Sequence, residues 1–436
     1  LPPQRNLAFD IGVTIGTIGR GYQLAIARGL LTAEVGRGTF VRGESAPVAT
    51  EQDADLDPII PINIRGWESE PNVHRMNSSC APDVGQVAAI APLIADIMQQ
   101  EPAKVLDYVR RVEPHWQEAG AKWMGVGDWR PDPNTIFPTQ GVHAAMTSII
   151  AACTAPGDKI VFEDITYASI ARAITALGRR VITVRTGPDG LDPDDLESVC
   201  AQQHPKLLVT VPTLHNPTSS ILPLAARKRV AEIAERHNLL VIEDNIYGLQ
   251  VDDAPQTIAE LAPDRTFHVS GLSKSVAAGV RAGWASCPMN FRNRVTVANK
   301  SMTGGNAYLM TELAARMVNT GVAYKLAQDV RKISQRRQQM VSEIFDGCTF
   351  ESHPCASYFW LRLEEPWLSG TFKAAARQNN IVIDDADHFK VGRDVRSPHR
   401  VRIAIGAIRD EAVVRQNLIV LRELMDTSPG GFDDYS

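Results

Sequence analysis

From about residue 60 onward, short apolar runs alternate with longer stretches of helical period. The apolar runs span 159–162, 180–184, 206–211, 239–243 and 266–270. Runs of this length are typical of strands buried on both faces, and helical stretches such as 224–237 fit between them as in βαβ units. The sequence therefore predicts an α/β fold, with a large domain over residues 61–315 built on a mostly parallel sheet.

A different mixture follows residue 315. A long charged helical stretch comes first, and strands and helices then intermix. This pattern predicts a smaller α+β C-terminal subdomain and tail over residues 316–436.

The first 42 residues show a third pattern. A helical run over 3–11 ends in a turn, and Thr14 is placed to cap a second helix. Two strand-like runs, 30–34 and 38–42, follow around a Gly-rich tip. Helix, turn, helix and a β-hairpin wing form a DNA-binding arrangement, so we assign residues 1–42 to a winged helix-turn-helix domain.

Composition and charge refine this division. The segment 43–60 is polar, acidic and without clear period, as expected of a linker. With 44% hydrophobic and 22% charged residues, the chain of 436 residues is able to bury a large core and is neither disordered nor fibrous. The formal net charge of −5 hides a basic head, since residues 1–42 hold five arginines against two acidic residues. A basic head on an acidic body fits contact with double-stranded DNA.

The cysteines and the apolar runs indicate in which compartment the protein is expected. Six cysteines are scattered, without a CxxC pair or a His/Cys cluster at metal-ligand spacing. We therefore expect reduced thiols, no metal and a cytoplasmic location. No run approaches the roughly 18 apolar residues of a membrane span, and we expect no signal peptide ahead of the first motif and no membrane partner.

The chemistry points to Lys274 and Asp244. Lys274 ends an apolar run among small residues, where a lysine can lose its proton and attack an aldehyde. By itself it is equally well a solvated surface charge. Asp244 ends the run 239–244, where a carboxylate needs a cationic partner. A protonated pyridine nitrogen supplies one, and a turn aspartate is the lesser alternative. The pair predicts pyridoxal 5′-phosphate (PLP), held by Lys274 as a Schiff base.

Two further residues are placed to tune that Schiff base. Asn216 follows the run 206–211, and Tyr247 lies three positions after Asp244. Both carry donors for the cofactor's 3′-oxygen. An Asn-Pro pair is usually only a turn, but this one lies at the carboxyl end of a predicted parallel strand, where α/β sheets place ligands.

A phosphate cradle is predicted from five residues: Gly141, Val142, His143, Ser273 and Arg281. The first three precede a predicted helix over 144–153, so free backbone N–H groups would face an anion. Such a helix start is, on its own, more often purely structural. Tyr167 is the candidate for stacking on the ring face, although a lone tyrosine is more often part of a core.

Arg402 lies inside an apolar strand-like run, 401–406. A buried guanidinium needs a planar anionic partner, and the α-carboxylate of an amino acid fits it bidentately. We therefore predict that Arg402 and Asn216 bind substrate. An internal salt bridge is the alternative for Arg402.

Five residues in this order and spacing resemble the motif set of the fold type I aminotransferases: Asn216, Asp244, Tyr247, Lys274 and Arg281. The resemblance spans roughly residues 60–425. It implies a homodimer in which Tyr108 reaches the phosphate of the neighbouring subunit, and Lys274, Asp244 and Tyr247 as the catalytic residues.

The head resembles the GntR-type winged helix, and a winged helix fused to an aminotransferase-like body is the layout of the MocR family of bacterial transcription regulators. In that family PLP and an amino acid or amine are sensed ligands. The resemblance implies DNA contacts from Arg5, Thr14, Thr17, Arg20 and Arg37. The winged helix of the family begins with one further helix, which is missing here, so the head is expected to be incomplete.

Two functions therefore remain open. The first is a PLP-dependent transcription regulator that senses an amino acid or amine. The second is a working aminotransferase, in which Lys274 also moves the α-proton and Arg402 orients the substrate. Glycines at 16, 19 and 21 each cost the second head helix about 1 kcal/mol relative to alanine, which favours the enzyme. The Gly-Arg-Gly wing tip at 36–38 favours the regulator.

Overall fold

The structure is a computed structural model that describes residues 1–4, 7–8, 14–27, 31–34, 38–41, 72–392 and 398–427. The chain divides into two compact units, Leu1–Ser69 and Glu70–Ser436. The boundaries at residues 42, 60 and 315 stay predictions.

The first unit contains the predicted helix and hairpin. Helix α2 (Ile15–Ala27) forms despite its three glycines, and the Thr17 N–H donates to Thr14 Oγ1 (3.2 Å) at its start. Strands β1 (Leu31–Glu34) and β2 (Gly38–Val41) pair antiparallel. Most of the predicted first helix and the wing tip lie outside the described residues.

A seven-stranded sheet is the centre of the second unit. Its order is β4 (Ile136–Thr139), β12 (Gly283–Ser286), β11 (Thr266–Gly271), β10 (Leu240–Asp244), β9 (Leu207–Thr210), β5 (Lys159–Glu163) and β6 (Arg180–Val184). Strand β12 runs antiparallel to both of its neighbours, and the other described pairs are parallel. The mostly parallel sheet predicted from the apolar runs is confirmed.

Helices bury both faces of this sheet. Neighbouring residues of a strand point to opposite faces, so β5 shows the packing on each side. In β5, Ile160 and Phe162 pack with helices α6 (Val142–Cys153) and α7 (Ser169–Ala176). Val161 packs instead with α8 (Pro193–Gln203) and α9 (Leu224–Arg236). Burial on both sides explains why the strands read as nearly continuous apolar runs.

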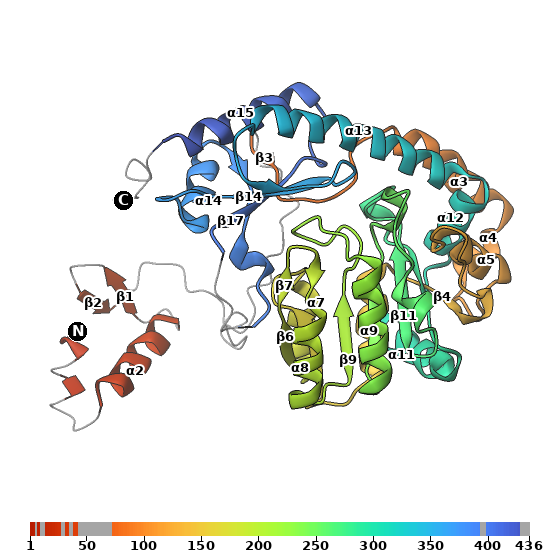
Figure 1. The fold of residues 1–436 in the computed structure, drawn as a ribbon, viewed down its shortest axis with the longest axis horizontal. Coiled ribbons are helices and arrows are strands. Elements are labelled where there is room, and N and C mark those ends of the chain that lie inside the picture. The colour runs from red at the N-terminus through yellow and green to blue at the C-terminus, as the bar shows by residue number, and fades with distance from the viewer. Residues whose placement is uncertain are drawn as a thin grey trace. The chain divides into compact units, whose positions relative to one another are not determined.

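A smaller antiparallel sheet follows in the second unit. Its order is β13 (Phe350–Glu351), β14 (Tyr358–Arg362), β17 (Arg400–Ala404) and β16 (Asp384–Asp385). It packs with α14 (Ser369–Gln378), α15 (Glu411–Met425) and the end of α13 (Val322–Ile344). Helix α13 runs from the region of α3 (Gln86–Gln100) and α12 (Tyr308–Asn319) to the small sheet (Figure 1).

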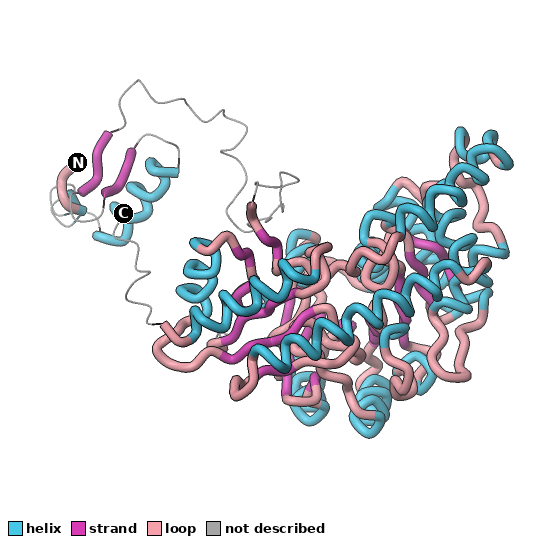
Figure 2. The backbone as a smooth tube through the Cα atoms, turned by 90° about the horizontal axis from the view of Figure 1, so that it is seen from above, coloured by secondary structure: helices cyan, strands magenta, loops and turns pink. Residues whose placement is uncertain are grey.

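Among the described residues the other α-helices and strands are α4 (Pro102–Leu106), α5 (Pro114–Trp123), α10 (Ile258–Leu261), α11 (Arg292–Thr303), β3 (His74–Arg75), β7 (Thr186–Gly187), β8 (Gly190–Leu191) and β15 (Ile381–Val382). Seen from above, the strands of the second unit lie among the helices that cover them (Figure 2). The loops at one edge of the large sheet form the candidate site.

Candidate cofactor site

The predicted cofactor residues lie together at one edge of the large sheet, where its parallel strands end. Asp244 is the last residue of β10, Lys274 follows β11 and Asn216 follows β9. Gly141 follows β4, and Arg281 precedes β12, whose antiparallel direction brings its amino end to the same edge. The carboxyl ends of parallel strands are where α/β folds bind ligands.

A cavity of about 160 Å³ lies at this edge. It is lined by Gly141, Val142, His143, Met146, Tyr167, Val211, Asn216, Asp244, Ile246, Tyr247, Ser273, Lys274, Ala278 and Arg281. The structure thus brings together all the residues predicted to hold the cofactor except Tyr108. Their individual roles stay predictions.

Lys274 reaches a serine that the sequence did not single out. Its Nζ donates to Ser79 Oγ (2.9 Å), and the Tyr247 hydroxyl donates to the same oxygen at 3.4 Å. Ser79 is buried, and burial also raises the pKa of Tyr247 to about 12. Ser79 therefore joins the amine of Lys274 to the phenol of Tyr247.

Asp244 is the buried carboxylate of the cavity. Burial raises its pKa to about 7, although the Ile246 N–H that donates to its Oδ1 (3.1 Å) and the charge of Lys274 both act to lower it. A raised pKa means that the ionised form lacks sufficient compensation in the folded chain. A cation placed against Asp244 would supply it.

The cationic part of the cavity is built around the start of α6. This helix begins at Val142, two residues earlier than predicted, so Val142 and His143 form its first turn. Gly141 precedes it at φ 86° and offers no side-chain acceptor for the first N–H groups. Burial, and then the charge of Arg281, lower the pKa of His143. The helix start and Arg281 are therefore the groups that favour an anion here.

These groups fit PLP. The ring nitrogen of the cofactor requires an acid partner, its phosphate requires N–H donors and a cation, and its aldehyde requires an amine. Asp244, the α6 start with Arg281, and Lys274 supply these three in a single cavity.

Asn216 and Tyr167 border the same space. Asn216 Oδ1 accepts from Arg402 Nη1 (2.8 Å), so the amide nitrogen is the atom left to donate to a ligand. Tyr167 is 40% exposed and belongs to the cavity wall rather than to a core.

Arg402 is buried behind the cavity, and the described lining of the cavity does not include it. Its Nη2 donates to Asp384 Oδ2 (2.5 Å) and to the Asn77 carbonyl oxygen (2.8 Å). Its guanidinium carbon lies 4.7 Å from the centre of the Phe389 ring. The internal salt bridge that was the alternative for Arg402 is thus present, and binding of a substrate carboxylate stays a prediction.

Tyr108 lies away from the cavity. It is 85% exposed and borders a separate surface hollow with Lys104 and Tyr308. Its proposed contact with a neighbouring subunit stays a prediction.

The predicted DNA-contacting residues are described in part. Thr14, Thr17 and Arg20 are exposed on or next to α2. The hydroxyls of Thr14 and Thr17 bond to each other at 2.9 Å, so both take part in the helix start. Arg5 and Arg37 lie outside the described residues.

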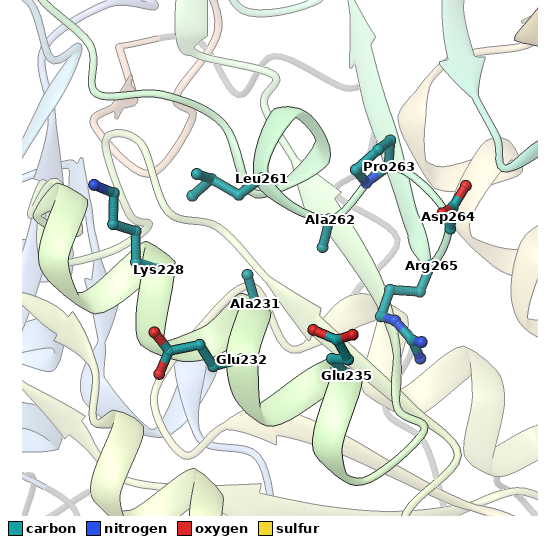
Figure 3. Close-up of a pocket in the computed structure, with 9 residues that line it drawn as sticks. All are labelled: Lys228, Ala231, Glu232, Glu235, Leu261, Ala262, Pro263, Asp264 and Arg265. Atoms are coloured by element: carbon teal, nitrogen blue, oxygen red, sulfur yellow. The ribbon is translucent and has the colours of Figure 1, made fainter.

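A larger hollow, of about 410 Å³, lies between α9 and residues 261–265 (Figure 3). Lys228, Glu232, Glu235, Asp264 and Arg265 border it. Residues 261–265 lead into β11, so this hollow is at the amino ends of the strands. It combines neither a buried carboxylate nor a helix start, so size alone does not locate the site.

Among the described residues, no helix has the length and apolar character that a membrane span needs. These residues also contain no group of three or more His, Cys, Asp or Glu residues that could hold a metal ion.

Comparison with known proteins connects this geometry to characterised folds. Residues 80–419 match the family model "Aminotransferase class I and II". The HTH-type transcriptional regulator YdeF of Bacillus subtilis is 27% identical, over 98% of this chain and 89% of its own length. The HTH-type transcriptional regulator YjiR of Escherichia coli is 26% identical, over 77% of this chain and 74% of its own.

A solved structure agrees with the fold. LysN, the α-aminoadipate aminotransferase of Thermus thermophilus, superimposes with a TM-score of 0.74 at 19% identity. The match covers 82% of this chain and 92% of LysN, whose crystal structure contains N-(5′-phosphopyridoxyl)-L-leucine. At this identity the likeness shows the fold alone.

Proposed function

Because the chain belongs to the aminotransferase class I and II family, we propose that it is a PLP-dependent transcription regulator of the MocR type. In this proposal residues 1–42 bind double-stranded DNA, 43–60 are a linker, 61–315 hold the cofactor, and 316–436 form the small subdomain. The cofactor is pyridoxal 5′-phosphate, and the fold is that of the fold type I PLP-dependent transferases. The sensed ligand is an amino acid or amine, and the regulator acts as a cytoplasmic homodimer.

One observation carries the cofactor part of the proposal: Asp244, Lys274 and the α6 start with Arg281 line a single cavity. When bound, PLP withdraws electrons from the ligand carbon that bears the amino group. Asp244 stabilises the proton on the ring nitrogen, and in return that cation relieves the burial of its carboxylate. Backbone N–H groups of α6, Ser273 and Arg281 hold the phosphate.

The remaining residues position the amine and the ring. Lys274 Nζ would bind the cofactor and serve as the base for the ligand, while Tyr247 and the Asn216 amide would donate to the 3′-oxygen. Ser79 sets the position of Lys274 Nζ and of the Tyr247 hydroxyl when the cofactor is not attached.

The regulatory part rests on the head. The described residues contain a helix, α2, and the antiparallel pair β1 and β2, as the predicted winged helix requires, and regulators named HTH-type align over most of this chain. Dimer rearrangement on ligand binding would reposition two heads on DNA, which requires a ligand with different affinities for the two arrangements.

A second candidate function is transamination between an amino acid and a 2-oxo acid. The observation in its favour is that the cavity holds a complete set of groups for proton transfer, Lys274, Asp244 and Tyr247. Nothing in that set requires DNA.

One experiment separates the two functions. The full chain, loaded with PLP, is titrated with amino acids and amines while its visible absorption is followed, and a 2-oxo acid is then added. The same protein is used to select duplexes from a random DNA library, and its affinity for them is measured with and without the responding amino compound.

We expect an amino compound to change the cofactor spectrum and the DNA affinity together, without sustained turnover. Repeated turnover on addition of the 2-oxo acid, with DNA affinity unchanged, would establish the aminotransferase instead.

A further inference from the structure

Nη1 and Nη2 of the Arg402 guanidinium already have acceptors within the chain, whereas its buried Nε has none among the described residues. A carboxylate binds a guanidinium bidentately along an edge formed by Nη2 with either Nη1 or Nε. Both hydrogens of Nη2 are taken, one by Asp384 Oδ2 (2.5 Å) and one by the Asn77 carbonyl oxygen (2.8 Å). Neither edge is therefore open to a ligand without displacing one of these acceptors.

Opposite charges already meet at this position. Arg402 and Asp384 are 3% and 5% exposed, so the guanidinium has an anionic partner in the protein interior. A ligand carboxylate brought to Arg402 would place two carboxylates against one buried cation. A buried charge without a partner is strongly unfavourable.

The cavity offers no other group for a carboxylate beside the amino group. Among its described lining residues the only lysine and arginine are Lys274 and Arg281, which the proposed function gives to the aldehyde and the phosphate. Burial and Arg281 lower the pKa of His143, so its imidazole is neutral near pH 7.

We infer that the ligand is a primary amine without a carboxylate on the carbon that bears the amino group, because Asp384 occupies the guanidinium that such a carboxylate would need. The inference rests on the proposed function and narrows its ligand class. Asp384 acts as a specificity residue through Arg402.

Matched pairs test this directly. The PLP-loaded full chain is titrated with L-leucine and 3-methylbutan-1-amine, L-phenylalanine and 2-phenylethylamine, and L-lysine and 1,5-diaminopentane. Binding is measured by calorimetry and by the change in cofactor absorption. Within at least one pair the amine should bind about tenfold or more tightly than its amino acid. Equal or tighter binding of the amino acid in every responding pair overturns the inference.

A substitution locates the cause. Asp384→Asn keeps the shape of the side chain and removes its charge, so amino acid affinity should rise about tenfold or more while amine affinity changes less than about threefold. The matched control is Asp385→Asn, the next residue, whose carboxylate pairs with Lys373 Nζ (2.9 Å) and should leave the preference unchanged. If Asp384→Asn fails to fold, the matched pairs still decide.

The outcomes also separate this inference from the proposed function. A chain that binds no PLP, or whose cofactor responds to neither member of any pair, contradicts both. A cofactor that responds to amino acids without preferring amines overturns the inference and leaves the regulator intact.

Discussion

At the scale of single residues, the buried carboxylate of Asp244 lowers the stability of the cofactor-free chain and favours binding of the cationic cofactor ring. Its pKa of about 7 lies above that of an unfolded aspartic acid, near 4, so the folded chain holds the proton more tightly. The cost of burying the ionised form is absent below about pH 4 and grows as the pH rises to about 7. Above pH 7 the cofactor-free chain carries the full cost.

Asp244→Asn should therefore stabilise the cofactor-free chain by about 1–3 kcal/mol at pH 8 and leave its stability nearly unchanged at pH 4. The same change should weaken PLP binding about tenfold or more, because the ring nitrogen loses its anionic partner. Urea denaturation at both pH values and a PLP titration measure the two effects. The exposed Asp253→Asn is the control, and a destabilised Asp244→Asn chain at pH 8 would contradict the argument.

The residues that sequence alone predicted and those that it missed differ in a physical way. Lys274 and Asp244 end apolar runs, where a charged side chain is conspicuous. Ser79 lies in no such run, Asp384 follows an apolar run of only three residues, 381–383, and Ser79 contacts Lys274 across 195 positions of sequence. Only the folded chain brings such partners together, so the salt bridge of Arg402 could be raised as an alternative but its partner could not be named.

At the scale of elements, the start of α6 is held by backbone shape. Gly141 at φ 86° lies in the left-handed region that side chains disfavour, and a Cβ there would stand 3.9 Å from the Arg281 carbonyl carbon. The predicted start of this helix was two residues late, because a glycine that caps without a side chain gives no sequence signal. The long strands, buried on both faces, were predicted well, whereas two-residue strands such as β16 carry no pattern to detect.

Gly141→Ala should cost about 1–2 kcal/mol in stability and also lower the affinity for PLP and for inorganic phosphate, because the N–H groups of α6 shift. Gly157→Ala is the matched control, since Gly157 has φ 89° with nothing within 4 Å of an added Cβ and does not line the cavity. The control should lose similar stability and keep its PLP affinity. Equal loss of PLP affinity in both variants would argue against a phosphate site at α6.

A buried arginine fixes the strands behind the site. Arg227 of α9 is fully buried, and its Nη1 lies 3.6 Å from Glu243 Oε1 of β10. Its Nη2 donates to the Pro212 carbonyl oxygen (2.8 Å) and to Thr213 Oγ1 (2.9 Å). It thereby joins a helix, a strand and the loop that leads to Asn216.

Arg227→Met should destabilise the chain by about 3–5 kcal/mol, because it leaves Glu243 as a buried charge without its arginine. Arg229→Met, on the same helix but with an exposed pair to Glu232 (3.4 Å), should cost no more than about 1 kcal/mol. Urea denaturation measures both. Equal effects would mean that the buried pair contributes no more than a surface one.

At the scale of the whole molecule, the sequence predicts a head and a body with different partners, and the chain has two compact units, Leu1–Ser69 and Glu70–Ser436. The pattern of residues does not report the free energy that couples ligand binding in the body to DNA binding by the head. Coupling between a ligand site and a DNA site is a difference between two arrangements of the chain, and neither local periodicity nor motif spacing reports it.

That coupling makes a prediction that thermodynamics fixes in both directions. If a saturating amine changes the affinity for DNA by some factor, typically about 5- to 150-fold, saturating DNA must change the affinity for the amine by the same factor. Fluorescence anisotropy with a labelled selected duplex gives the first factor, and the cofactor absorption gives the second. Arg20→Ala, on the exposed side of α2, should weaken DNA binding and lower its salt dependence without moving the amine titration of the DNA-free chain. If neither affinity changes, ligand binding and DNA binding are independent of each other. The cavity would then serve an aminotransferase whose head does not respond to the ligand.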